Sequence, residues 1–412
     1  MVKELKHTEL GDIPADWGIQ TFEETFKVLS NNTLSRDNLN YRGGAVRNIH
    51  YGDILIKFPE VLNCEKDEIP YVNDISLLTS STQLLQDGDI VIADTAEDDA
   101  VGKVTEVQHL ADKKLVAGLH TIPCRVKKGD FAPGWLGYYM NSHMYHDQIL
   151  PFVTGIKVSS ISKSAIAETL ILIPPKEEQE RIVNILNDME QCIYSNKSML
   201  EKYKKIREGQ IQALISCKKG TDSKIRISGY TRPWKNYRVG DMFSVTRGYV
   251  LAATTLENNK SSDAPYPVYS SQTKENGLLG FYKDYLYEDA ITWTTDGANA
   301  GTVKYRAGKF YCTNVCGVLL SDKEKATKMI AESLNAVSKG YVSYVGNPKL
   351  MNNVMADIEI RIPQDTKERE EISEYLLIID EQIETLLDKI KKYQFVKSGA
   401  ISELITGKIR LV

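Results

Sequence analysis

The sequence lacks the short motifs that identify the common enzymes acting on nucleic acids and nucleotides. It has no Asn/Asp-Pro-Pro-Tyr/Phe tetrapeptide, which holds the target base in amino-methyltransferases; the nearest segments are Ile173-Pro-Pro-Lys and Gly346-Asn-Pro-Lys. Neither Gly308-Lys309 nor Gly407-Lys408 has the earlier glycine and the following Ser or Thr of a phosphate-binding loop. These absences argue against an autonomous methyltransferase or nucleotide hydrolase.

Metal ligands are also scarce, with six histidines and six cysteines in 412 residues. No CxxC pair occurs, and Cys312 and Cys316 are four residues apart in a segment with the character of a strand. His143 and His146 have no third ligand at a plausible spacing. We therefore expect no metal site in this chain, and we expect its thiols to be reduced.

Long hydrophobic segments are missing as well. No run of about eighteen apolar residues occurs, and the first residues, Met1-Val-Lys-Glu-Leu-Lys-His, are charged and lack the apolar core of a signal peptide. The hydrophobic content of 42% and the charged content of 26% are typical of a well-cored chain with two or three domains. The sequence thus predicts a cytoplasmic protein.

The formal net charge of −4 conceals a difference between two parts of the chain. Residues 1–175 carry 16 Lys and Arg against 24 Asp and Glu, a net charge of −8. Residues 217–363 carry 20 against 14, a net charge of +6. Because nucleic-acid binders usually show a basic surface, the second part fits that class better, and the first would need local clustering of its basic residues.

The sequence does contain a repeat of one amphipathic segment. After Ile173-Pro-Pro, apolar residues recur at steps of three and four, the period of a helix with one apolar face, and the same pattern returns after Ile362-Pro363. The two apolar seams are Ile182, Leu186, Met189, Ile193, Leu200 and Tyr203, and then Ile372, Leu376, Ile379, Ile383, Leu386, Ile390 and Tyr393. This duplication predicts two copies of one unit, each a globular part followed by a long helix.

The length of the predicted helices suggests how they pack. About forty residues at roughly 1.5 Å each give a helix of about 60 Å, which is too long to pack fully on one domain of about 150 residues. We expect each helix to pair with the other copy in an antiparallel coiled coil, because a globular domain separates the two along the chain. The alternative is that each seam docks on its neighbouring domain.

The predicted fold class is α+β, with two α/β domains separated by two long antiparallel helices that form an intramolecular coiled coil with pseudo-twofold symmetry. Short β-branched and aromatic runs bounded by Gly, Asp and Asn predict the strands, at residues 51–57, 87–93, 120–126, 266–269, 290–293, 310–313 and 318–320. The predicted domain ranges are 1–175 for the first globular domain, 176–217 for the central helix, 218–363 for the second globular domain, and 364–412 for the last helix and tail.

The chain resembles the specificity subunit of type I restriction-modification systems over essentially its full length. The most specific motif is Ile173-Pro-Pro-Lys-Glu-Glu-Gln-Glu-Arg-Ile182 with its helix, repeated once. The other matching segments are Ile13-Pro14 to Trp17, Pro233-Trp234, Gly88-Asp-Ile-Val-Ile with Gly102-Lys-Val, Pro267-Val-Tyr-Ser-Ser-Gln, and Gly297-Ala-Asn-Ala-Gly-Thr-Val303. Each motif alone is weak, but their order and their duplication are specific.

The resemblance implies a DNA-binding role without chemistry of its own. Each globular part would be a target recognition domain that reads one half of a bipartite double-stranded DNA site, and the helices would be spacers. Two modification subunits would bring S-adenosylmethionine-dependent adenine methylation, and restriction subunits would bring ATP- and Mg-dependent translocation and cleavage. No cofactor is expected in this chain. The modification subunits are expected to dock on the outer faces of the helices.

Residues that read base edges are expected on strand ends and loops and to carry bidentate or hydroxyl groups. In the first domain the candidates are Asn31, Asn32, Arg36, Arg42, Arg47, Thr95, Thr154, Lys157, Ser159 and Ser160. In the second domain they are Arg247, Tyr249, Ser271, Gln272, Thr273, Lys274, Thr295, Asn299, Asn347 and Lys349. The alternative for any one of them is an ordinary polar turn.

Two other classes of function remain open on the sequence. One is an autonomous nuclease or methyltransferase, against which the missing motifs argue. The other is a protein-binding coiled-coil scaffold that does not read DNA, and the net charge of −8 in residues 1–175 is its best support.

Overall fold

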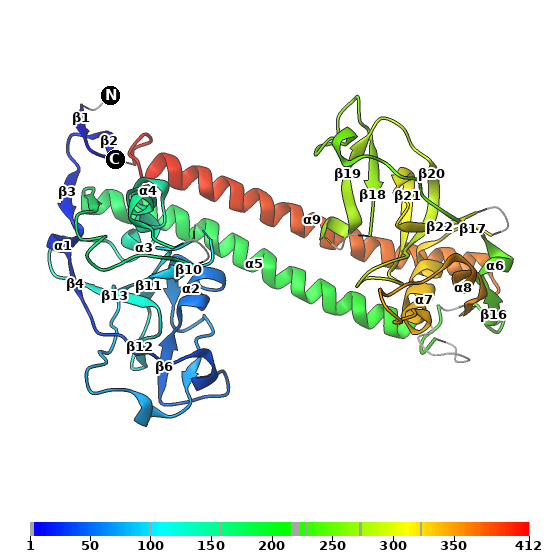
Figure 1. Ribbon diagram of the computed structural model, residues 1–412, viewed down its shortest axis with the longest axis horizontal. Helices are drawn as coiled ribbons and strands as arrows, with labels where there is room; N and C mark the ends of the chain where they lie inside the picture. The colour runs from blue at the N-terminus through cyan, green and yellow to red at the C-terminus, as the bar shows by residue number, and fades with distance from the viewer. Residues whose placement is uncertain are drawn as a thin grey trace. The chain divides into compact units, whose positions relative to one another are not determined.

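The computed structural model describes residues 4–98, 100–155, 158–215, 223–227, 229–271, 274–321 and 324–411, except for the side chains of residues 274 and 275. The chain divides into two compact units (Figure 1). Unit 1 contains Met1–Ser195 and Ile390–Val412, and unit 2 contains Asn196–Lys389. Each unit therefore contains one globular domain together with parts of both long helices.

Unit 1 is a mixed α/β domain. Its strands are β1 (Leu5–Thr8), β2 (Gly11–Pro14), β3 (Gly18–Thr21), β4 (Phe26–Val28), β5 (Leu39–Asn40), β6 (Val46–Ile49), β7 (Val61–Asn63), β8 (Tyr71–Val72), β9 (Ile90–Ala93), β10 (Thr95–Ala96), β11 (Val104–Gln108), β12 (Lys114–Ala117), β13 (Thr121–Val126), β14 (Ser159–Ser160) and β15 (Leu170–Ile173). Its short helices are α1 (Phe22–Thr25), α2 (Tyr51–Ile56), α3 (Trp135–Met140) and α4 (His143–Ile149). Two sheets dominate, with strand orders β4-β13-β9-β11-β7 and β12-β6-β8-β5.

Unit 2 repeats the main sheet. Its strands are β16 (Lys235–Arg238), β17 (Ser244–Arg247), β18 (Tyr266–Tyr269), β19 (Leu278–Tyr282), β20 (Tyr287–Thr294), β21 (Val303–Cys312), β22 (Cys316–Leu320) and β23 (Glu359–Ile362), and its short helices are α6 (Val239–Met242), α7 (Lys328–Ser338) and α8 (Asn352–Asp357). The strand order is β17-β22-β20-β21-β18-β19. In both sheets the first four strands are antiparallel to their neighbours and the fifth pairs in parallel, β7 with β11 and β18 with β21. The duplication in the sequence is thus also a duplication of topology.

One predicted strand is a helix. Residues 51–57 were expected to be extended, but Tyr51–Ile56 forms α2. The His50 side chain accepts a hydrogen bond from the Gly52 backbone N–H and caps this helix, while the buried Asp53 is held by a bidentate ion pair with Arg36. The helix cap and the tertiary ion pair therefore outweighed the strand preference of the β-branched residues, and neither can be recognised in a short window of sequence.

The two repeated amphipathic segments are helices α5 (Lys176–Leu214) and α9 (Thr366–Leu404). Nine of the thirteen predicted seam residues are buried: Ile182, Leu186, Ile193, Leu200, Ile372, Leu376, Ile379, Leu386 and Ile390. Met189, Tyr203 and Ile383 are half-buried. Tyr393 was predicted wrongly, because it is 38% exposed. Lys397, one helical turn further along α9, is buried.

The helices are antiparallel in each unit, where the beginning of one packs beside the end of the other. In unit 1, Ile182 shares an apolar cluster with Leu404, and Lys397 Nζ lies 2.6 Å from Glu190 Oε2. In unit 2, residues 211 and 214 of α5 belong to the cluster that contains residues 372 and 376 of α9. Arg207 also forms an ion pair with Asp380.

The start of each long helix is fixed by a tryptophan and an arginine that share one buried glutamate. In unit 1, Glu178 accepts hydrogen bonds from Trp17 Nε1 at 3.0 Å and from Arg410 Nε and Nη2 at 2.6 and 2.7 Å. In unit 2, Glu368 accepts from Arg226 Nε and Nη2 at 2.9 and 2.6 Å, and Trp234 Nε1 lies 3.5 Å away. Arg410 follows the end of α9 and binds at the start of α5, and Arg226 follows the end of α5 and binds at the start of α9. Each cluster therefore joins the start of one long helix to the segment that follows the other long helix.

Candidate nucleic-acid interface

In unit 2 the ends of several strands are joined by backbone hydrogen bonds. The Tyr249 N–H, just beyond β17, donates to Cys312 O at the end of β21, and the Thr313 N–H donates to Tyr269 O at the end of β18. The Thr295 N–H, just beyond β20, donates to Val315 O before β22. Loops that are far apart in the sequence thus meet where these strands end. We call this end of the sheet its edge, and bases could be read there.

A hairpin of residues 343–349 lies against this edge. Ser343 and Lys349 are bridged to each other, and Lys349 is also bridged to Asp296. The Leu350 N–H donates to Thr295 O at 2.9 Å. Unit 1 has the same arrangement in residues 154–160: Thr154 and Ser160 are bridged, Ser160 pairs with Thr95, and the Ile161 N–H donates to Asp94 O at 2.9 Å. We call the two segments the edge hairpins.

Several of the predicted DNA-contact residues lie close together in or beside the edge hairpins. In unit 1 the structure brings together Thr95, Thr154, Ser159 and Ser160. In unit 2 it places Lys349 and Asn347 in the hairpin beside Asp296, with the Lys349 ammonium 3.9 Å from the Asp296 carboxylate. Tyr249 is 63% exposed at the same strand ends, and Arg247 Nε donates to Asn352 Oδ1 at 3.1 Å.

Three predicted contact residues are corrected because they are buried. Asn32 donates from Nδ2 to Asn48 Oδ1 and Ala117 O, each at 2.8 Å. Arg47 is 5% exposed; its Nη1 donates to Cys64 O at 2.6 Å, while its Nε and Nη2 are buried without a hydrogen-bond partner among the described residues. The Thr295 hydroxyl donates to Asp296 Oδ2 and Val315 O and has no exposed surface.

The remaining candidates differ in their accessibility. Asn31 is half-buried and donates to Gly118 O and Thr121 O, while Arg42 is exposed. Arg36 keeps 44% of its side chain exposed despite its ion pair with Asp53. Ser271 and Asn299 line a cavity in unit 2. Lys157, Gln272 and Thr273 lie outside the described residues, as does the side chain of Lys274.

Sequence reasoning missed several groups at these edges. In unit 1, the rings of His50, Tyr51 and His120 form a series with centroid distances of 4.6 and 5.2 Å, and His120 Nδ1 lies 3.2 Å from Thr95 Oγ1. In unit 2, the edge hairpin exposes Tyr344 by 69% and Val345 by 93%. Exposed apolar side chains of this kind are used by some proteins to wedge between base steps. No periodicity marks them in the sequence, so only the fold identifies them.

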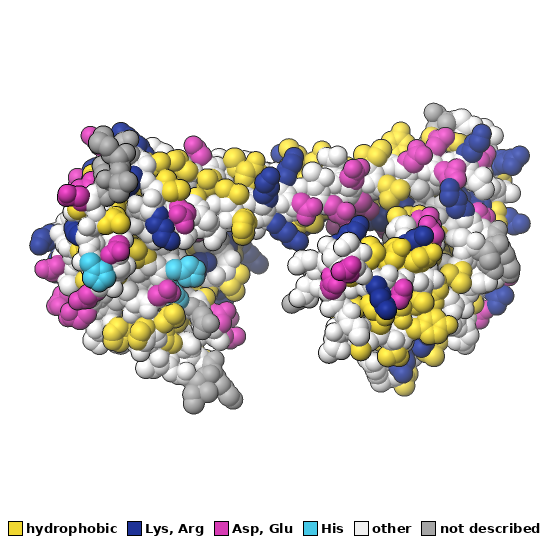
Figure 2. All heavy atoms as spheres, turned by 90° about the horizontal axis from the view of Figure 1, so that it is seen from above, with side chains coloured by type: hydrophobic (Ala, Val, Ile, Leu, Met, Phe, Trp, Pro, Cys, Tyr) yellow, Lys and Arg dark blue, Asp and Glu magenta, His cyan; other side chains and the backbone are white. Residues whose placement is uncertain are grey.

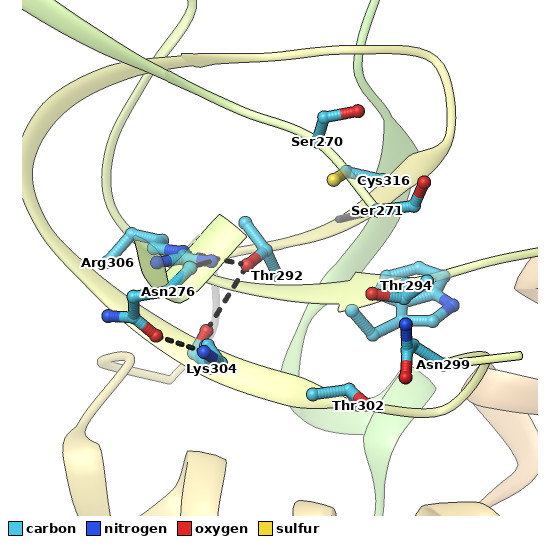
Figure 3. Close-up of a pocket in the computed structure, with 11 residues that line it drawn as sticks. Ser270, Ser271, Asn276, Thr292, Thr294, Asn299, Thr302, Lys304, Arg306 and Cys316 are labelled. Carbon is cyan, nitrogen blue, oxygen red and sulfur yellow. Dashed lines mark hydrogen bonds between the residues drawn. The ribbon is translucent and has the colours of Figure 1, made fainter. Parts of the chain in front are cut away.

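The cavity in unit 2 adds two cationic residues that the sequence did not single out. It has a volume of about 50 Å³ and is lined by Ser270, Ser271, Thr294, Asn299, Lys304 and Arg306 among others (Figure 3). It therefore joins the two polar loops that were predicted from the sequence, the one after β18 and the one after β20. Alternation along β21, which places residues 304 and 306 on one face, was the available signal.

The surface charges are mixed. On the face shown in Figure 2, Lys and Arg side chains are interspersed with Asp and Glu and with exposed apolar side chains. In the parts of the chain that the structure describes, no group of three or more His, Cys, Asp and Glu residues could hold a metal ion. No described helix is long and apolar enough to cross a membrane. DNA contact would accordingly depend on local groups at the strand ends.

Comparison with known proteins agrees with this arrangement. A family model described as the type I restriction modification DNA specificity domain matches residues 14–205 and 231–392, once for each repeat. A putative type I specificity subunit of Mycoplasma pneumoniae is 30% identical over 227 residues, which cover 54% of this chain and 88% of that protein. The putative specificity subunit of the type I restriction enzyme MjaX of Methanocaldococcus jannaschii is 23% identical over 425 aligned positions, covering 98% of this chain and 96% of that one.

The fold is shared with a solved structure. The crystal structure of a type I restriction-modification S subunit from M. genitalium matches with a TM-score of 0.66 at 15% identity, covering 98% of this chain and 99% of that chain. The family model covers far more than half of the sequence, and its two matches coincide with the two copies seen in the sheets and helices. This chain therefore belongs to the family of type I restriction modification DNA specificity proteins.

Proposed function

We propose that this chain is the DNA-recognition subunit of a type I restriction-modification complex, and that each globular domain reads one half of a bipartite double-stranded site. The observation that carries the proposal is the duplicated edge hairpin. In both units it is bridged to the backbone just beyond a central strand, at Asp94–Thr95 and at Thr295–Asp296. Two copies of one reading surface are what a site in two halves requires.

Under this proposal the long helices set the gap between half-sites. Helices α5 and α9 have 39 residues each, so each rises by about 58 Å. Both helices also expose apolar side chains, for example Ile206 at 49%, Ile378 at 59% and Phe395 at 81%. We assign the docking of two modification subunits to these faces. S-adenosylmethionine, ATP and Mg would bind to modification and restriction subunits, this chain would be non-catalytic, and the complex would act in the cytoplasm, where the DNA is.

Shortening both helices tests the spacer role. Under this proposal, residues 193–199 of α5 would pair with 388–394 of α9, because Glu190 pairs with Lys397 in unit 1 and Arg207 with Asp380 in unit 2. Removing both heptads keeps the seam in phase and shortens the pair by about 10 Å, so the methylated site should lose about three base pairs from its gap. Sequencing of methylated adenines in cells that express the chain with its modification subunits measures the gap.

A matched variant makes this test symmetrical. Inserting one heptad at each of the same places should lengthen the gap by about three base pairs. An unchanged gap in both variants would contradict the spacer role while leaving the recognition of the half-sites intact.

A second experiment separates recognition from a purely protein-binding scaffold. Tyr344→Ala combined with Asn347→Ala changes only exposed side chains of one edge hairpin. If the hairpin reads DNA, the methylated sequence should be relaxed in one half-site and unchanged in the other. A scaffold without its own readout would give the wild-type site.

A further inference from the structure

The cavity of unit 2 contains an unusual set of lining groups. Among the described residues that line it are hydroxyls, amides and two cations, Lys304 and Arg306, and no carboxylate. In Figure 3, Arg306, Asn276 and Lys304 lie together on one side, and Thr294, Asn299 and Thr302 lie on the other. The described lining therefore offers hydrogen-bond donors and positive charge, and none of its described residues is a carboxylate.

Arg306 is buried, with 6% of its surface exposed, yet its described contacts are neutral. Nε lies 3.2 Å from Thr292 Oγ1, Nη2 donates to Asn276 O at 3.0 Å, and the guanidinium lies 3.7 Å from the centre of the Tyr269 ring. No ion pair links it to a described residue. Because burying a charge is costly unless an opposite charge compensates it, Arg306 marks a place where an anion would be stabilised.

Lys304 lies two residues away on the same face of β21 and also has no ion pair with a described residue. It donates to Asn276 Oδ1. Burial, followed by the charges of Arg306, Lys328 and Arg207, lowers the pKa of Lys304 to about 8, while Glu332 acts in the opposite direction. Glu332 itself is paired with Arg207 and Lys328. Among the described residues, no carboxylate is thus paired with either cation of the cavity.

The size of the cavity limits the ligand. A water molecule needs about 10–15 Å³ of such volume, so about 50 Å³ holds roughly four oxygen-sized groups. That number suits a tetrahedral oxyanion and is too small for an unstacked base with its sugar. The location suits the same ligand, because Ser271 and Asn299 belong to the loops that leave the strand ends at the candidate interface.

We propose that this cavity is a seat for one phosphate group of the DNA backbone, held by Lys304, Arg306 and the hydroxyls of Ser271 and Thr294. This inference rests on the proposed function. A phosphate contact carries no sequence information but fixes the register of the domain on the duplex, so that the edge hairpin and strand ends meet the intended bases. Binding of this phosphate would position unit 2 on the duplex before the unit reads the bases of its half-site.

The test uses the full chain in complex with the modification subunits and duplex DNA with and without the target site. Lys304→Gln removes a charge from the cavity. Lys309→Gln is the matched control, since Lys309 lies on the same strand, is exposed, and contacts the Tyr285 ring. Lys304→Arg keeps the charge and controls for folding. Affinity is measured over a range of salt concentrations.

The expected result is a plot of log affinity against log salt that is shallower for Lys304→Gln by about 0.9, the value for one phosphate contact. At 0.1 M salt this corresponds to a loss of about 5- to 10-fold in affinity, equal on target and non-target duplexes. Lys309→Gln and Lys304→Arg should keep the wild-type slope. Replacing each phosphate of the target in turn by a neutral methylphosphonate should reveal one position that weakens the wild type but not Lys304→Gln.

Other outcomes overturn the assignment. An unchanged slope for Lys304→Gln would show that the cavity takes no phosphate. A loss confined to the target duplex would mean that Lys304 reads a base. If the wild-type complex bound neither duplex, the proposed function itself would fail, and that result is distinguishable because it does not depend on the variant.

Discussion

Individual charged residues in this protein fall into two groups, according to whether a partner compensates their burial. Lys397, which is 8% exposed, lies within 2.8 Å of the carboxylates of Glu60 and Glu190, and these outweigh the effect of burial and raise its pKa. Lys304 forms no ion pair with a described carboxylate, and burial together with neighbouring cations lowers its pKa despite the opposing effect of Glu332. A buried lysine in a helix seam must be paired with carboxylates, as Lys397 is, to be stable. A buried lysine without such a pair, as Lys304 is among the described residues, can serve in a ligand site.

The lowered pKa of Lys304 predicts a pH dependence of DNA binding. The charge that would hold a phosphate is present below pH 8 and is lost as the pH rises through about 8, with Arg306, Lys328, Arg207 and Glu332 as the neighbouring charged groups. At constant salt, we expect the wild-type affinity for duplex DNA to fall several-fold between pH 7 and pH 9. Lys304→Gln should show a flatter profile over this range. Equal profiles for the two proteins would contradict the prediction.

The element with the clearest structural signature is the start of each long helix. Glu178 and Glu368 occupy equivalent positions in the two repeats, have almost no exposed surface, and each accepts hydrogen bonds from an arginine that follows the opposite helix. The arrangement satisfies a carboxylate near a helix N-terminus, where the helix dipole also favours negative charge. It fixes where one helix begins relative to where the other ends.

Replacing these glutamates should destabilise the units separately. Glu178→Gln leaves the Arg410 guanidinium without one of its two carboxylate partners, and we expect a loss of about 2 kcal/mol in the free energy of unfolding of unit 1. Glu368→Gln should affect unit 2 in the same way. Glu177→Gln, at an exposed neighbouring position, should change stability by less than about 0.5 kcal/mol. Urea unfolding followed by limited proteolysis of each unit measures the effects.

Equal effects of Glu177→Gln and Glu178→Gln would mean that the buried cluster contributes little to stability. A loss in the wrong unit would contradict the pairing of each arginine with the opposite helix.

At the scale of the whole molecule, unit 1 is not a continuous segment of chain. It needs Ile390–Val412, which supplies Leu404 and Ile405 to its main apolar cluster, Lys397 to its ion pairs, and Arg410 to Glu178. The chain returns to complete the unit with which it began. The folding of the first domain is thereby linked to residues that follow the whole of unit 2 in the sequence.

Truncation after residue 389 should therefore destabilise the first domain, although that domain lies at the other end of the sequence. Loss of the buried Leu404 and Ile405, of the buried Lys397 and of the half-buried Arg410 should cost at least about 5 kcal/mol, which is comparable to the total stability of many domains. Limited proteolysis should then cut residues 1–195 much faster than in the full chain, while unit 2 stays protected. A first domain as resistant as in the full chain would contradict the composition of unit 1.

The sequence by itself determined the features that depend on local spacing. The duplication, the two long helices and most of their buried seam follow from apolar residues at steps of three and four, because the helix period turns spacing directly into a shared face. Strands β9, β13, β20 and β22 were predicted from β-branched runs. Resemblance to one family, carried by repeated motifs, gave the class of function.

The tertiary structure alone decided which polar side chains remain available. Asn32, Arg47 and Thr295 have the composition of contact residues, yet partners as distant in sequence as Ala117 bury them. The same kind of long-range contact turned residues 51–56 into a helix and buried Lys397, while Tyr393, the predicted seam residue, is exposed. Burial and pairing depend on segments that meet only after folding, so spacing along the chain could not reveal them, nor the cavity of Lys304 and Arg306.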